Sequence, residues 1–113
     1  MKALIAVKST ERRDALYALL ESLGIDVIHQ ASDAETSRRT VNEQDPALIL
    51  TDFNLSSAVP AANPAAIIVL VADRVEAAQA RAAGATHVFI EGTPVSQIVD
   101  AINALMNFNN RQE

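Results

Sequence analysis

The chain has 113 residues, half of them apolar, with 14 acidic and 9 basic side chains and a formal net charge of −5. This length suits one globular domain, and the acidic excess argues against a nucleic-acid groove, which needs a basic face. Cysteine is absent, which excludes disulfides and thiolate metal sites. No apolar run reaches the roughly 20 residues of a membrane span, and the N-terminal run, broken by Lys8, is too short for a signal peptide. We therefore expect a cytoplasmic protein without membrane contact.

The first quarter of the chain predicts a strand, a helix and a second strand. Residues 3–7 are apolar throughout, as in a central parallel strand. Ser9 or Thr10 can cap a helix, whose leucines recur at helical spacing until Gly24, a typical residue just past a helix end. The strand that begins at Asp26 is less apolar, so we expect it at an edge of the sheet.

The next helix is predicted to be marginal. Residues 32–35 match a capping box. The helix that follows has a thin inner stripe, with only Ala34 and Val41 apolar and Ser37 between them. We expect it to end before Pro46.

The stretch 45–55 carries the main functional candidate. The apolar run from Ala47 to Thr51 suits a parallel strand buried on both faces, and Asp52 follows at its carboxyl end. Ligand sites of α/β sheets lie at that edge, which makes Asp52 a candidate site residue. The alternative is an Asp that caps the turn after the strand.

The segment from 54 to 66 is rich in Ala, Ser, Pro and Asn, and its prolines disfavour a long helix. Residues 67–72 form another apolar strand. Residues 73–76 are a second capping box, which opens an Ala-rich helix that stops at Gly84. Residues 87–90 read as a strand.

The last helix has a strong apolar face over 95–106, with Thr93 as its cap and Pro94 at its first position. Strands that alternate with helices imply a parallel sheet with right-handed crossovers. We predict one α/β domain over residues 1–107, with helices on both faces of a five-stranded sheet, and a polar tail over 108–113.

Other candidate sites are weak. The glycines are isolated, so no phosphate-binding loop is present in the sequence. His29 and His87 lie far apart without metal-ligand spacing, and we expect no metal site. Acidic residues flank Arg12-Arg13 and Arg38-Arg39, which we interpret as solvated helix faces, with a partner-binding role as the alternative.

Six segments, taken in order, resemble the receiver (CheY-like) domain of the response regulators of bacterial two-component systems. They are residues 2–7, 19–24, 45–52, 64–72, 82–85 and 98–106. The resemblance covers nearly the whole chain. It implies a flavodoxin-like sheet in the order 2-1-3-4-5, with Asp52 at the family's phospho-acceptor position.

The chain departs from the family at most positions of the phosphorylation chemistry. Receivers carry a Mg²⁺-binding acidic pair after the first strand, where this chain has Lys8 and Ser9. They carry Ser or Thr at the end of the fourth strand, where it has Val71, or Ala72 if the register slips by one. They carry Lys at the end of the fifth strand, where it has Glu91.

These departures argue against Mg²⁺-dependent phosphorylation. Mg²⁺ prefers carboxylate and other oxygen ligands, and phosphoryl transfer relies on its charge. Lys8 adds a positive charge where the cation would lie, and Glu91 would repel a phosphoryl group. We expect no cofactor, and we predict that Lys8 lies near Asp52, Glu91 or both, so that the pocket is satisfied without metal.

The switch positions also differ from the family. The aromatic switch position of the fifth strand falls on Val88, and the hydroxyl position of the fourth falls on Val71. No hydroxyl is available to move and no ring to follow it, so a phosphoryl-biased two-state element is missing. We therefore expect Asp52→Asn to leave the fold and partner binding nearly unchanged.

The crossover after Asp52 is shorter than the family's, which implies that the third helix is shortened or missing. On the face of the sheet that this helix would cover, we predict one of two arrangements. Either the alanines form a thin layer over the strands, or an apolar patch is exposed near Ala58 and Val59. The second arrangement makes Ala58 and Val59 the interface candidates.

The predicted function is an atypical receiver-like signalling module that binds a protein partner or a second copy of itself, without enzyme activity beyond self-phosphorylation at Asp52. Two alternatives are a phospho-accepting response regulator that uses Asp52, and a small-molecule sensor at the carboxyl edge of the sheet.

Overall fold

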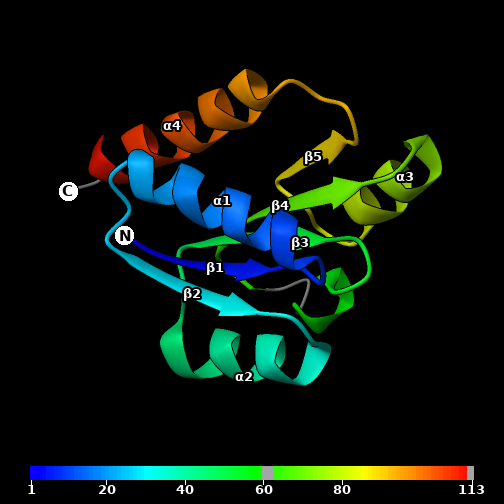
Figure 1. The fold of residues 1–113 in the computed structure, drawn as a ribbon, viewed down its shortest axis with the longest axis horizontal. Helices are drawn as coiled ribbons and strands as arrows, with labels where there is room; N and C mark the ends of the chain where they lie inside the picture. Colours follow the sequence, from blue (N-terminus) through cyan, green and yellow to red (C-terminus); the bar gives the residue numbers. More distant parts are fainter. Residues whose placement is uncertain (60–62, 112–113) are drawn as a thin grey trace.

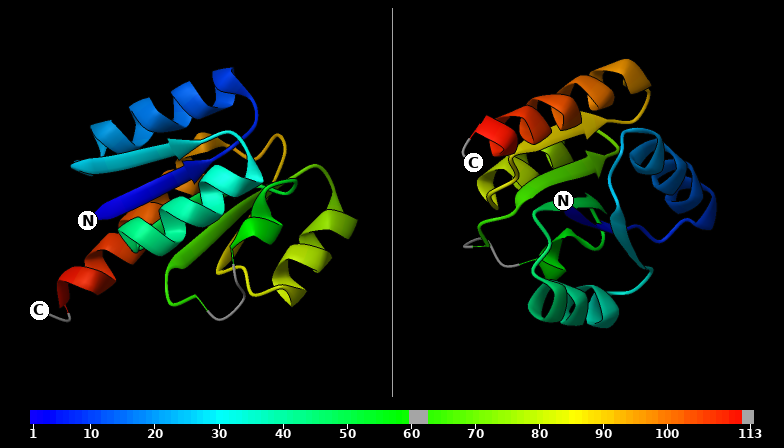
Figure 2. Two further views of the ribbon diagram at one scale, coloured as in Figure 1. Left: turned by 90° about the horizontal axis from the view of Figure 1, so that it is seen from below. Right: turned by 90° about the vertical axis from the view of Figure 1, so that its left-hand side faces the viewer.

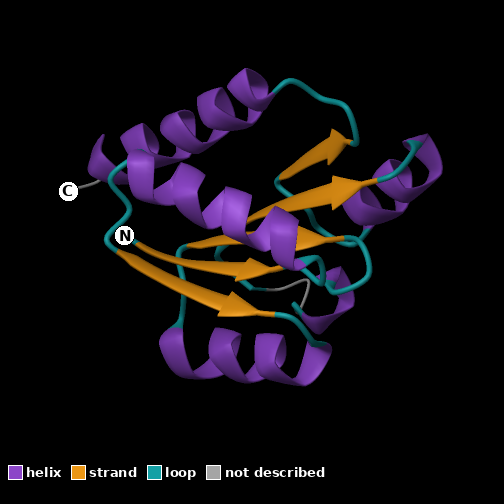
Figure 3. Ribbon diagram, viewed as in Figure 1, coloured by secondary structure: helices purple, strands orange, loops and turns teal. Residues whose placement is uncertain are grey.

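The computed structural model describes residues 1–59 and 63–111 of the chain (Figure 1). Its elements, in chain order, are β1 (Lys2–Ala6), α1 (Thr10–Ser22), β2 (Val27–Ala31), α2 (Ala34–Gln44), β3 (Leu48–Asp52), the 3-10 turn η1 (Ser56–Ala58), β4 (Ala66–Val71), α3 (Arg74–Ala82), β5 (His87–Ile90) and α4 (Val95–Arg111). The five strands form one parallel sheet in the order β2-β1-β3-β4-β5 (Figure 3). The predicted strand order is therefore correct. None of the described helices has the length and apolar character to cross a membrane.

The first two helices begin with side-chain caps, and one of them is shifted from the prediction. Ser9 caps α1, since its hydroxyl accepts a hydrogen bond from the Arg12 N–H. Helix α2 is capped by Asp33, one residue later than the capping-box pattern implies. The reason is that the Asp33 carboxylate accepts from both the N–H and the hydroxyl of Thr36, at 2.7 and 3.0 Å. These two bonds hold the pKa of Asp33 below its ordinary value.

Helix α4 begins and ends later than predicted. Its first residue is Val95, so Pro94 precedes the helix, and the Thr93 hydroxyl donates to the Ile90 carbonyl of β5 at 2.6 Å. This bond ties Thr93 to the end of the strand. At the other end α4 continues to Arg111, so the predicted start of the polar tail at residue 108 falls within the helix.

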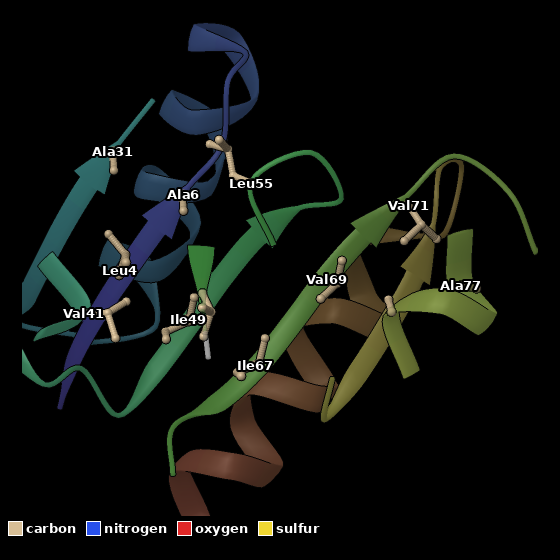
Figure 4. Packing of buried hydrophobic residues seen from close by; sticks show 12 residues of the cluster. Leu4, Ala6, Ala31, Val41, Ile49, Leu55, Ile67, Val69, Val71 and Ala77 are labelled. Atoms are coloured by element: carbon tan, nitrogen blue, oxygen red, sulfur yellow. The ribbon is translucent and has the colours of Figure 1, made fainter. Parts of the chain in front are cut away.

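Helices lie on both faces of the sheet, as the two views in Figure 2 show, and an apolar cluster packs on each face. On one face the strands pack against α1 and α4, whose buried residues include Leu16, Leu20, Ile98 and Ile102. On the other face they pack against α2, η1 and α3. Figure 4 shows this second cluster, in which Ile67, Val69 and Val71 lie along one face of β4. The first and last helices therefore share one face of the sheet.

The segment between β3 and β4 was predicted to contain a shortened third helix or none. In the described part of this crossover the only helical turn is η1, three residues long, as the prolines predicted. Leu55, Ala58 and Val59 are only 2%, 2% and 8% exposed, and Leu55 and Val59 belong to the same cluster as Ile49 and Ile67. Ala58 and Val59 therefore form no exposed apolar patch. The apolar side chains of this crossover fill the space left by the missing helix, which is the thin-layer alternative.

We predict that Leu55→Ala lowers the free energy of unfolding by about 2–5 kcal/mol, because it leaves a cavity beneath a segment without regular backbone bonding. Val75→Ala on α3 is the control, since Val75 is 66% exposed and should matter by less than about 0.5 kcal/mol. Urea denaturation followed by circular dichroism measures both. Equal stabilities of the two variants would mean that the η1 segment does not form part of the core.

Candidate functional site

All the residues predicted for the pocket line one cleft at the carboxyl edge of the sheet. The cleft has a volume of about 270 Å³ and lies where β1, β3, β4 and β5 end. Its lining includes Lys8, Ser9, Asp52, Val71 and Glu91. The other predicted switch residue, Val88, lies deeper in the sheet. It pairs with Val69 of β4 and packs against the cluster on the α2 side.

The Asp52 carboxylate joins two loops at this edge. One oxygen, Oδ2, accepts a hydrogen bond from the backbone N–H of Lys8 at 2.8 Å. The other, Oδ1, accepts from the backbone N–H of Leu55, also at 2.8 Å. Asp52 therefore ties the β1–α1 loop and the turn before η1 to the end of β3. The alternative interpretation, that Asp52 caps the turn after the strand, fits this bond to Leu55, and the cap extends to a second loop.

Lys8 contributes its backbone to the pocket and not its charge. Its N–H meets Asp52, which fulfils the predicted proximity. Its side chain is exposed, however, and the ion pairs among residues 1–59 and 63–111 are those of the Met1 amino group with Asp26 and of Arg12 with Glu91. The predicted pairing of the Lys8 cation with Asp52 or Glu91 is therefore wrong. Lys8 lies two residues after the end of β1, and its backbone N–H points to Asp52 at the end of the neighbouring strand β3.

Arg12 supplies the positive charge that the sequence analysis assigned to Lys8. Its Nη2 lies 2.8 Å from Glu91 Oε1, and the two side chains are 50% and 63% exposed. Arg13 also has a role, because its Nη1 donates to the Val7 carbonyl at 2.9 Å and braces the β1–α1 loop. Both arginines were interpreted as a solvated helix face. The sequence showed only that acidic residues flank the two arginines. It could not show the pairing of Arg12 with Glu91, because Glu91 lies 79 positions away.

The β4 side of the cleft is apolar, and its nearest backbone donor is occupied. Val71 is buried in the cluster with Ala77 (Figure 4). The Ala72 N–H donates to Glu76 Oε1 at 2.9 Å. Neither residue therefore offers a free hydrogen-bond donor to a group bound in the cleft, because a valine side chain has none and the amide is already used.

This fold, with its parallel strands in the order 2-1-3-4-5, is the flavodoxin-like fold of response-regulator receiver domains. A signal receiver domain of a response regulator from Bermanella marisrubri matches with a TM-score of 0.81 and 16% identity over 93% of this chain and 97% of that chain. A response regulator receiver protein from Pseudomonas putida matches with a TM-score of 0.75 and 24% identity, over 90% and 94%.

An N-terminal domain of an uncharacterized protein from Wolinella succinogenes has a TM-score of 0.84 and 17% identity, and the match covers 100% of this chain and 99% of that one. At these identities the likeness establishes the fold alone. The sequence itself matches no protein-family model and no curated protein.

The geometry changes the expectation for Asp52→Asn. The amide keeps one acceptor oxygen but turns an NH₂ donor toward a backbone N–H, so we predict a loss of about 1.5–3 kcal/mol in the free energy of unfolding. Asp100→Asn, on the exposed side of α4, should change it by less than about 0.5 kcal/mol. Chemical denaturation compares the two variants. If they are equally stable, the Asp52 bonds do not contribute in solution.

Proposed function

We propose that this chain is a receiver-like signalling module that acts by binding a protein partner and does not depend on phosphorylation of Asp52. The observation that carries the proposal is the state of the Asp52 carboxylate, both of whose oxygens accept backbone hydrogen bonds from the chain itself. Phosphorylation would turn one of these acceptor oxygens into the bridging oxygen of an acyl phosphate and would have to break a loop contact. In this reading Asp52 is retained for structure.

The donor set supports the absence of a Mg²⁺ step. Mg²⁺ requires near-octahedral oxygen ligands, usually with one or two carboxylates and several waters. The positions of the family's acidic pair hold Lys8 and Ser9, and the guanidinium of Arg13 lies against the carbonyl of Val7 in the same loop. Within the described residues no three acidic or histidine side chains converge as metal ligands. These residues do not fit Mg²⁺, and no step of the proposed function uses it.

The groups that would hold and sense a phosphoryl group are also replaced. Val71 offers no hydroxyl, and Glu91 carries a negative charge that Arg12 already neutralises. Val71 and Val88 pack in or against the apolar cluster on the α2 side. A phosphoryl group at Asp52 would therefore lack both a charge partner on β5 and a side chain that could report its arrival.

We predict that incubation with Mg²⁺ and an acyl phosphate leaves the intact mass unchanged, and that Mg²⁺ with fluoroberyllate leaves the amide NMR signals of the cleft in place. A receiver that autophosphorylates under the same conditions is the positive control. A mass gain of one phosphoryl group that disappears in Asp52→Asn would instead establish the alternative function, a phospho-accepting regulator. That alternative is worth testing because the Asp52 carboxylate does line an open cleft.

The partner surface that we propose is the hollow between η1 and α3. It has a volume of about 570 Å³, and its lining includes Phe53, Ser57, Gln79 and Ala83. It lies on the α2 side of the sheet, and small side chains such as Ser57 and Ala83 line it beside Phe53 and Gln79. A concave surface with small, weakly polar walls admits a protruding side chain or helix from another protein.

We predict that Ala83→Glu weakens partner binding or self-association, because it places a charge at the wall of this hollow. Ala82→Glu is the matched control on the same helix, since Ala82 is exposed but does not line the hollow. Val59→Glu is unsuitable because Val59 is buried. Analytical ultracentrifugation measures self-association, and titration measures binding of any identified partner. A monomeric wild type with no partner that discriminates the two variants would contradict the proposed surface.

A further inference from the structure

A second cleft lies on the opposite side of the Arg12–Glu91 pair from Asp52. It has a volume of about 270 Å³ and opens between α1 and the start of α4. Its walls are mainly apolar and include Leu16, Leu70, Phe89, Val95 and Ile98. Ala15 of α1 also lines it, and this small side chain leaves the space open. Val95 is 60% exposed although it belongs to the wall, so this apolar surface is accessible to a ligand.

The polar groups at the rim have unused hydrogen-bonding capacity. Arg12 and Glu91 line both clefts, and the contact between them joins Arg12 Nη2 to Glu91 Oε1. A guanidinium has five N–H donors, and a carboxylate has two acceptor oxygens. Among the described residues this contact is the only side-chain hydrogen bond that either group makes. An exposed pair of this kind contributes little to stability, so a ligand can rearrange it at little cost.

The shape and charge of this site define the class of ligand that would fit. A ligand with only a carboxylate would pair with Arg12 and leave Glu91 unpaired. A ligand with only an amine would pair with Glu91 and leave Arg12 unpaired. A zwitterion satisfies both, because its carboxylate can accept from Arg12 while its ammonium donates to Glu91. An apolar group attached to that zwitterion would lie against Leu70 and Phe89 in the cleft.

We propose that the cleft between α1 and α4 binds a free α-amino acid with a large apolar side chain, such as leucine or phenylalanine. Arg12 holds the α-carboxylate, Glu91 holds the α-ammonium, and the side chain occupies the apolar cleft. The site uses neither Asp52 nor the hollow between η1 and α3. The proposal therefore goes beyond the proposed function, and either can fail without the other.

The test is a titration of the ¹⁵N-labelled full chain with four compounds, followed by amide NMR shifts. L-Leucine and L-phenylalanine should give saturable shifts at Leu16, Phe89, Gly92 and Thr93. 4-Methylpentanoate lacks the ammonium and 3-methylbutylamine lacks the carboxylate, so each should bind at least tenfold more weakly than leucine. The absence of saturable shifts with leucine, or equal binding of leucine and either truncated analogue, would overturn the proposal.

Variants assign the binding to this cleft. Arg12→Gln and Glu91→Gln should each weaken leucine binding about tenfold or more, as loss of a hydrogen bond to a charged group does. Ala15→Met should abolish binding by filling the cleft from an exposed helix position, and thermal unfolding will show that this variant remains folded. Arg38→Gln on α2 is the control and should bind leucine as the wild type does. Wild-type affinity in Ala15→Met or Glu91→Gln would refute this site.

Discussion

The structure depends on one carboxylate that serves two loops. Asp52 stands at the end of the central strand, and its two oxygens accept the backbone N–H groups of Lys8 and Leu55. These bonds fix where β1 passes into α1 and where β3 passes into η1. The same turn delivers Leu55 into the core. An oxygen acceptor in this position thus couples the geometry of the sheet edge to the packing beneath it, and the Asp52 side chain braces the two loops.

Other polar groups at the carboxyl edge of the sheet are also paired with groups of the same chain. Glu76 accepts from the Ala72 amide, Arg13 donates to the Val7 carbonyl, and Arg12 neutralises Glu91. Each of these bonds pairs a polar group of the sheet edge with another group of the same chain. On the α2 side, the crossover segment and the alanines of α3 form a thin layer in place of a full helix. The fold keeps the receiver topology while its polar groups pair with one another.

The sequence predicted the regular part of this structure because regular elements have periodic patterns. Unbroken apolar runs such as 67–72 marked buried strands, and the Ser9 cap marked the start of α1. The burial of Ala58 and Val59 could not be read in the same way, because an irregular segment has no period that tells its inner side from its outer side. The pairing of Arg12 with Glu91 depends on how two distant loops meet, and the sequence indicated only that Arg12 has acidic neighbours. Lys8 was correctly predicted to lie near Asp52. However, its backbone N–H, and not its side-chain ammonium, makes the contact.

The most direct test of this account is a measurement of scalar coupling across the two Asp52 hydrogen bonds in the ¹³C,¹⁵N-labelled protein. The account predicts that the amide nitrogens of both Lys8 and Leu55 are coupled to the side-chain carboxylate carbon of Asp52, and that both amides exchange slowly with solvent. If neither coupling is present and both amides exchange at the rate of an open loop, the carboxylate is free in solution and the central claim is wrong.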